Sequence, residues 1–336
     1  MFKFKRHISE NFWYNPLFFK NKIIGNTKNG SVVILDAESF ENLKTIESSV
    51  PITTIKLNEN FLFFSDKIAS FCFDLNSLNQ PPQKIENASL LPSLIDENSI
   101  YLNSVNSAGD MLSKFDRNTK ALIGLSEHMI GRDIVKKGQN LIFSEKGFLS
   151  RKVYCVDSNN GKVLWVFNLE EYDTEELPRV LSPLHLHEEY LFVSLSGQSL
   201  LKIDCSDGSL VWQKNINDRI KFYDSDLINL DASAYREISP NDGTVLHEVT
   251  LTEEYKRHGF RSIGTNSNFT IDQTHIYIVD PMGFKAGALN RKTGQLDWSA
   301  NIGLSNVTLP HPPIVTKSEL FVLDDIGTLH IFDRET

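Results

Sequence analysis

Residues 152–169, KVYCVDSNNGKVLWVFNL, carry the most informative pattern of the chain. Apolar residues alternate along a first strand up to Asp157, a short polar turn closes on Gly161, and a second strand carries Trp165. An Asp side chain at a strand end accepts hydrogen bonds from backbone N–H groups two residues on, and glycine adopts the positive φ that tight turns need. The stretch therefore predicts a β-hairpin whose tryptophan is buried against a neighbouring sheet.

The same spacing returns further along the chain. In each copy glycine follows the strand-ending residue by four positions and tryptophan follows it by eight. The further copies are Asp204, Gly208 and Trp212, and then Asn290, Gly294 and Trp298. A weaker copy, Ser239, Gly243 and His247, has histidine in the place of tryptophan. A single hairpin cannot bury such side chains alone, so the repeat predicts an array of adjoining units.

These units resemble the tryptophan-docking repeats of pyrroloquinoline-quinone-type eight-bladed β-propellers. That pattern runs apolar-x-apolar-Asp-x-x-Thr-Gly-Lys-x-x-Trp, and the motif is strong only between residues 150 and 302. The strands that end at Asp36, Asp74 and Asp116 lack both the glycine and the tryptophan. The resemblance implies that one set of residues docks neighbouring blades together. This set is Trp165, Trp212, Trp298, Gly161, Gly208 and Gly294.

A strand, a polar turn and a second strand ending in Asp or a substitute occur eight times, from residues 23–36 to residues 320–333. Eight units of 42 residues suit four strands each. We therefore predict an all-β fold, a single domain over residues 1–336 that forms an eight-bladed propeller of four-stranded antiparallel blades, with seven blades as the alternative. The last unit stops before its fourth strand. Phe2 to Ile8, FKFKRHI, alternates apolar and basic side chains, and we predict that residues 1–9 close the ring as the outer strand of the last blade.

Composition limits the classes of partner. The formal charge of −9, from 34 basic and 43 acidic residues, disfavours nucleic acid and favours a basic protein. No segment approaches 18 uninterrupted apolar residues, so we expect no membrane span. The N-terminus lacks the apolar core of a secretory signal, so we expect a cytoplasmic protein unless a leader has been removed. We also expect a monomer. Cys72, Cys155 and Cys205 form no CxxC motif and are expected to be small buried side chains.

The sequence gives no support for catalysis. As the resemblance implies, a quinone-dependent dehydrogenase needs a calcium site, a catalytic Asp and usually two adjacent cysteines, and this chain has no adjacent cysteines. His185 and His187 share one face of a strand, a spacing that suits zinc, but the sequence indicates no third ligand. We therefore assign no catalytic, cofactor-binding or metal-binding residue and expect a protein that is not an enzyme.

Two long connections between the predicted blades combine acidic residues with a tyrosine, a composition typical of protein contacts, although solvated loops are the alternative. Residues 169–178 contain Glu170, Glu171, Tyr172, Asp173, Glu175 and Glu176, and residues 251–268 contain Glu253, Glu254 and Tyr255. We expect a non-enzymatic protein-binding propeller, in the first instance a cytoplasmic immunity-type protein that neutralises a bacterial toxin. The alternatives are a scaffold of envelope assembly, a small-ligand-binding or sugar-binding propeller, and a quinone-dependent dehydrogenase-like propeller.

Overall fold

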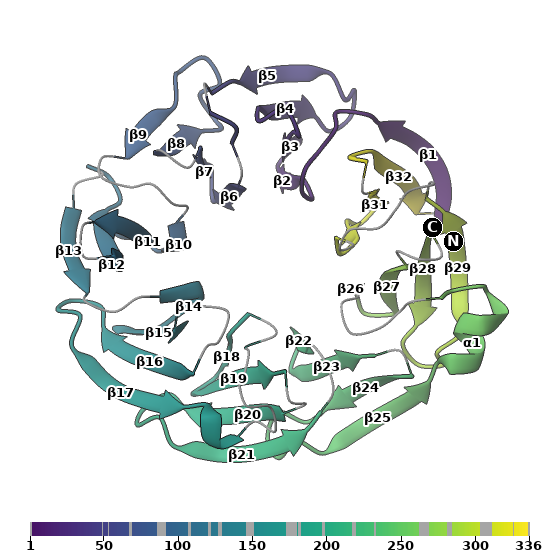
Figure 1. Ribbon diagram of the computed structural model, residues 1–336. Helices are drawn as coiled ribbons and strands as arrows, with labels where there is room; N and C mark the ends of the chain where they lie inside the picture. The colour runs from purple at the N-terminus through teal and green to yellow at the C-terminus, as the bar shows by residue number, and fades with distance from the viewer. Residues whose placement is uncertain are drawn as a thin grey trace. The chain divides into compact units, whose positions relative to one another are not determined.

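The computed structural model describes residues 2–334 except 49, 53, 67–68, 86–91, 107–108, 120–121, 127–129, 146–150, 173–179, 181–182, 197–198, 217–219, 232, 262–268, 281–283, 303–310 and 325. Its strands form eight four-stranded sheets, each of which is antiparallel throughout (Figure 1). The predicted all-β fold of eight four-stranded blades, an eight-bladed β-propeller, is therefore confirmed, and the alternative of seven blades is wrong.

The chain divides into two compact units, Met1–Ile46 with Asn217–Thr336 and Glu47–Ile216, and each unit contains four of the sheets. The expectation of a single domain over residues 1–336 stays a prediction. The strands of the Glu47–Ile216 unit are β6 (Thr54–Asn58), β7 (Phe61–Ser65), β8 (Ser70–Asp74), β9 (Gln83–Ile85), β10 (Pro92–Ile95), β11 (Ser99–Asn106), β12 (Gly109–Asp116), β13 (Leu122–Ser126), β14 (Ile130–Lys137), β15 (Asn140–Glu145), β16 (Lys152–Asp157), β17 (Val163–Asn168), β18 (His185–His187), β19 (Tyr190–Leu195), β20 (Ser199–Asp204) and β21 (Leu210–Asn215). A 3-10 turn, η1 (Glu170–Tyr172), follows β17.

The other unit holds the first and the last strands of the chain. Its strands are β1 (Phe2–Ile8), β2 (Leu17–Phe19), β3 (Lys22–Asn26), β4 (Val32–Asp36), β5 (Asn42–Ile46), β22 (Ile220–Tyr223), β23 (Asp226–Leu230), β24 (Ala234–Ile238), β25 (Val245–Thr250), β26 (Phe269–Ile271), β27 (His275–Asp280), β28 (Lys285–Asn290), β29 (Leu296–Asn301), β30 (Ile314–Val315), β31 (Glu319–Leu323) and β32 (Leu329–Arg334). One short helix, α1 (Thr252–Arg257), follows β25 in the described residues.

Burial changes across each sheet in a regular way. The second and third strands are buried almost along their whole length, as in β19 and β20, because apolar side chains on both faces pack against other parts of the core. The fourth strand alternates half-buried and exposed residues, as in β21. The core of each unit is therefore built from the middle strands, and the outer strands carry side chains that reach solvent.

The turn between the third and fourth strands has the predicted geometry. In the central copy, Gly161 N donates to Asp157 O at 2.8 Å, and the Asp157 carboxylate accepts from Asn159 N at 2.7 Å. Gly161 adopts a φ of 70°, a conformation that suits glycine. In the turn between β4 and β5, Phe40 takes the glycine position with a φ of 62°. The spacing of strand-ending residue and glycine thus predicted the hairpins correctly.

The N-terminal strand completes the last sheet, whose order is β1-β32-β31-β30. The pairing of β1 with β32 runs from Phe2 opposite Arg334 to Ile8 opposite Leu329, with one irregularity between Phe4 and Arg6. Figure 1 draws the two strands side by side. The prediction that the start of the chain supplies the outer strand of the last blade is confirmed for residues 2–8.

Candidate protein-binding surface

The first acidic segment is the η1 turn that follows β17. Tyr172 is half-buried and stacks on Phe167 with ring centroids 5.0 Å apart, and its carbonyl oxygen accepts a hydrogen bond from Gln213 Nε2 at 3.0 Å. Glu170 and Glu171 are exposed, and Glu170 lies 3.1 Å from Arg151 Nε. Tyr172 therefore anchors a turn whose two carboxylates face solvent. The other predicted members of this segment, Asp173, Glu175 and Glu176, lie outside the described residues.

The second acidic segment is the short helix α1, which belongs to the other unit. Glu253 is 81% exposed and pairs with Lys256 at 2.9 Å. Glu254 is only 13% exposed, and its Oε1 accepts a hydrogen bond from the backbone N–H of Leu296, on β29, at 2.8 Å. The expectation that Glu254 faces a partner is corrected, because its carboxylate attaches the helix to the neighbouring sheet.

Tyr255 is also buried, although the sequence analysis expected it to contact a partner. Its side chain is 6% exposed and packs in the core with Leu251 and Phe260, so it offers no area to a partner. Burial raises the pKa of the Tyr255 hydroxyl well above its ordinary value, with a smaller contribution from Asp231. The i, i+4 spacing of Leu251 and Tyr255 on a helix is the sequence signal that indicates a buried face here.

We expect Tyr255→Phe to leave the free energy of unfolding unchanged or to raise it by about 1 kcal/mol, because the buried Tyr255 hydroxyl has no hydrogen-bond partner among the described residues. Tyr235→Phe is the matched control, since the Tyr235 hydroxyl bonds to Glu237 and to Arg291. That control should lose about 1–2 kcal/mol. Urea denaturation measures both variants, and equal losses would contradict the description of Tyr255.

Trp165 docks on the turn of the next sheet within its unit. The indole is 8% exposed, and its Nε1–H donates to Cys205 O at 3.0 Å. The ring lies directly against Gly208, where an added Cβ would come within 2.7 Å of Trp165 Cδ2. Gly208 is therefore required twice, for its φ of 77° and for the space it leaves to the indole.

The two other tryptophans are less buried than predicted. Trp212 and Trp298 are half-buried, and each meets a phenylalanine edge to face, Trp212 with Phe192 at 5.7 Å and Trp298 with Phe332 at 5.0 Å. Part of each indole is exposed on β21 and β29, and the expectation that Trp212 and Trp298 dock neighbouring blades together stays a prediction. The turn glycine Gly294 is contacted by a valine and not by a tryptophan, since a Cβ added at Gly294 would lie 2.2 Å from Val249 Cγ1.

The predicted cysteines and histidines lie in ordinary structural positions. Burial, with a smaller effect of Cys205, raises the pKa of Cys155 to about 12, and burial raises the pKa of Cys205 to about 11, so both thiols stay protonated at neutral pH. His185 and His187 are half-buried on β18. Within the described residues no group of three or more His, Cys, Asp or Glu side chains is placed to hold a metal ion. No described helix has the length and apolarity to cross a membrane.

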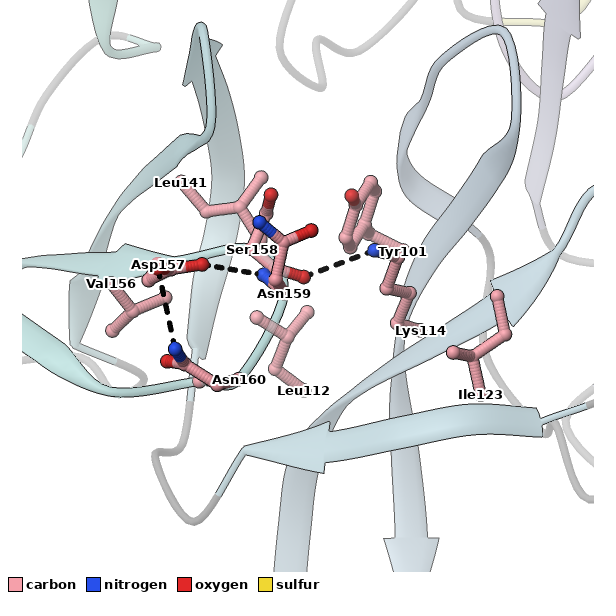
Figure 2. A pocket seen from close by; sticks show the side chains of 11 residues that line it. Tyr101, Leu112, Lys114, Ile123, Leu141, Val156, Asp157, Ser158, Asn159 and Asn160 are labelled. Carbon is pink, nitrogen blue, oxygen red and sulfur yellow. Dashed lines mark hydrogen bonds between the residues drawn. The ribbon is translucent and has the colours of Figure 1, made fainter.

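A pocket of about 100 Å³ lies between the sheet of β10–β13 and the sheet of β14–β17 (Figure 2). Leu112, Leu141 and Val156 form an apolar wall, and the turn 157–161 forms a polar edge. Lys114 Nζ crosses from the first sheet and donates to Ser158 O at 3.1 Å. Sequence reasoning did not identify this pocket.

Comparisons with known proteins place the chain among propellers. A family model described as "Outer membrane protein assembly factor BamB" matches residues 150–324, just over half of the chain. BamB from Moraxella catarrhalis is 12% identical, with a TM-score of 0.70, over 99% of this chain and 100% of that chain. The computationally designed Ika8 protein is 11% identical, with a TM-score of 0.71, over 98% of both chains. Sqt1 from Saccharomyces cerevisiae is 12% identical, with a TM-score of 0.67, over 100% of both chains.

These identities are low, so the likeness to the three solved structures establishes the fold and nothing more. Among curated proteins, no sequence matches the chain. The family model covers the part of the sequence in which the tryptophan motif is strongest, residues 150–302.

Proposed function

The chain belongs to the family described as outer membrane protein assembly factor BamB, a family of pyrroloquinoline-quinone-like β-propellers. Because of this membership, we propose that the chain is a non-enzymatic scaffold that binds a protein. The description of the family names an assembly process at the outer membrane, which corresponds to the envelope-assembly alternative drawn from the sequence. This alternative is our first candidate for the process in which the scaffold acts.

The observation that supports protein binding is the way in which the acidic connections are held. Tyr172 is fixed by ring stacking and by the hydrogen bond from Gln213, and α1 is fixed by Tyr255 and Glu254. Glu171 and Glu253 extend from these anchored segments into solvent. A carboxylate on an ordered backbone loses little conformational freedom on binding, and negative charge accelerates the approach of a basic partner.

The finer expectations stay proposals. We propose that the partner is basic, in keeping with the formal charge of −9, and that the chain acts as a monomer. The immunity-type function is retained as a second candidate for the same acidic segments, because a secreted basic toxin would be recognised by the same charges. A basic toxin that crosslinks at Glu171 would favour this second candidate over the assembly scaffold.

The partner can be captured with a photoreactive amino acid placed at position 171. Leu164, which is 47% exposed on β17, the strand that η1 follows, is the matched control position. A protein that crosslinks from position 171 and not from position 164 is the expected result. Equal crosslinking from both positions would assign the capture to random collision and would contradict binding through η1.

We expect Glu171→Ser combined with Glu253→Ser to slow association with the captured partner by about threefold at low salt and to have little effect at high salt, because exposed charges act through screened attraction. The matched control is Glu38→Ser combined with Glu97→Ser, which removes the same charge from exposed residues elsewhere, one in each unit. Surface plasmon resonance measures both association rates. An identical slowing in the control would mean that only net charge matters and that η1 and α1 are solvated connections.

A further inference from the structure

The register of the sheets defines one docking position on every outer strand. In the sheet of Trp165, the indole stands opposite Cys155, two residues before the strand-ending Asp157. The same rule selects Gly124 opposite Lys114, His247 opposite Glu237, and Arg6 opposite Ile331. The side chains of Trp165, His247 and Arg6 contact the third-to-fourth-strand turn of the next sheet.

In three pairs that lie within one unit, the side chain at this position contacts the next turn. Trp165 Nε1 donates to Cys205 O, one residue after the strand-ending Asp204, at 3.0 Å. His247 Nε2 lies 3.3 Å from Arg291 O, one residue after Asn290, and so contacts the corresponding carbonyl. Arg6 uses a different contact, with its guanidinium carbon 4.5 Å from the centroid of the Phe40 ring.

The docking position on β13 is Gly124, which has no side chain to place there. The corresponding turn of the next sheet is 157–161, and this turn lines the pocket of about 100 Å³ together with Ile123, which precedes Gly124, and Lys114, which pairs with it. Ser158, one residue after Asp157, supplies the carbonyl that corresponds to Cys205 O in the filled socket. The pocket therefore lies where the other outer strands insert a docking side chain.

We propose that this pocket is a docking socket for a tryptophan side chain of a protein partner. The proposal rests on the proposed function, namely that the chain binds a protein, and it names the kind of group that is bound. The neighbouring socket, filled by Trp165 within the same unit, is the precedent for an indole on such a turn. A partner's indole would take the place that residue 124 leaves open.

The lining suits an indole better than it suits a polar ligand. Leu112, Leu141 and Val156 supply apolar contact to a ring. Ser158 O accepts from Lys114 and keeps a second lone pair for an indole N–H. Ile123, 54% exposed, lies in the lining beside solvent and gives the mouth an apolar edge. A closed cavity of about 150 Å³ holds a whole benzene molecule. The open pocket of about 100 Å³ therefore accommodates much of an aromatic ring.

The socket is tested first without any partner. N-acetyl-5-fluorotryptophanamide is titrated with the full chain and its ¹⁹F resonance is followed by NMR. We expect saturable broadening and shift with the unmodified chain, and a dissociation constant about tenfold weaker with Ile123→Glu, which places a charge at the mouth. Leu164→Glu is the matched control, because Leu164 has the corresponding position on β17, is 47% exposed, and borders a socket that Trp165 already fills.

A second variant fills the socket from within. Gly124→Trp should abolish binding of the probe and raise the melting temperature by a few degrees, because the new indole finds the wall and carbonyl described above. Leu164→Trp adds an indole at an exposed position of the next outer strand. It should change neither the binding of the probe nor the melting temperature. The proposal is overturned if the unmodified chain does not bind the probe saturably, or if Ile123→Glu and Gly124→Trp both bind it as the unmodified chain does.

The two proposals can fail separately. If no partner crosslinks from position 171 but the probe binds and is displaced by Gly124→Trp, the socket stands and the assignment of the acidic segments fails. With a captured partner, Gly124→Trp should weaken the complex by about tenfold or more while Leu164→Trp leaves it unchanged. Concentration-dependent self-association in sedimentation, lost only in Gly124→Trp, would assign the socket to a second copy of the chain and overturn a foreign partner.

Discussion

Deletion of residues 1–9 is expected to remove cooperative unfolding and to produce oligomers at micromolar concentration. The deletion removes β1, so β32 becomes an unpaired edge with free N–H and C=O groups. It also removes Phe2, whose ring lies 5.3 Å from Trp298 and 5.7 Å from Tyr277, and the buried Ile8. Loss of these apolar contacts should cost about 4 kcal/mol or more, a large part of the stability of an ordinary domain.

Urea denaturation and light scattering measure the two effects of the deletion. Lys5→Ala is the control, because it removes only the ion pairs of the 35% exposed Lys5 with Glu319 at 2.7 Å and with Asp333 at 3.2 Å. Such a pair contributes less than about 1 kcal/mol, so the control should unfold almost as the full chain does. A truncated chain that stays monomeric and unfolds at the same urea concentration would show that β1 does not stabilise the last sheet.

Trp165→Ala is expected to lower the free energy of unfolding by about 3–5 kcal/mol. The change leaves a cavity against Gly208 and deprives Cys205 O of the hydrogen bond from the indole. Trp212→Ala is the control with the same chemical change, and it should cost about half as much because Trp212 is half-buried. Equal losses at the two positions, measured by urea denaturation, would show that docking on the glycine turn adds nothing.

The fold could be predicted because its rule is local and repeated. The four-residue interval from Asp157 to Gly161 determines a turn through contacts within a few residues. The eightfold recurrence of two strands joined by a polar turn indicates the number of sheets. The burial of each tryptophan depends instead on what the next sheet presents. Trp165 finds Gly208, whereas the neighbour of Trp298 is completed by β1, from the other end of the chain. Spacing alone does not contain that information.

The candidate site was predicted less well than the fold. The acidic composition of both connections was visible in the sequence, but Tyr255 and Glu254 pack inward because α1 adds a helical periodicity that a reading as an extended loop does not include. The pocket had a signal that was not used: Gly124 follows Asp116 by the eight residues that separate Asp157 from Trp165. A glycine at a docking offset marks a missing side chain, but only the folded structure brings Lys114 and Ser158 together around the space.

The pairing of β1 with β32 also has a consequence for biosynthesis. Residues 8 and 329 pair directly, and at about 5–20 residues per second a ribosome needs roughly 15–65 s to proceed from one to the other. During this interval β1 has left the ribosome without its partner strand. In β1, FKFKRHI, the basic residues Lys3, Lys5 and Arg6 are interspersed with apolar residues. Positive charges on an unpaired strand oppose its pairing with a wrong strand. The last sheet is therefore completed only after β30, β31 and β32 have been translated. A chaperone that protects nascent chains would act longest on β1.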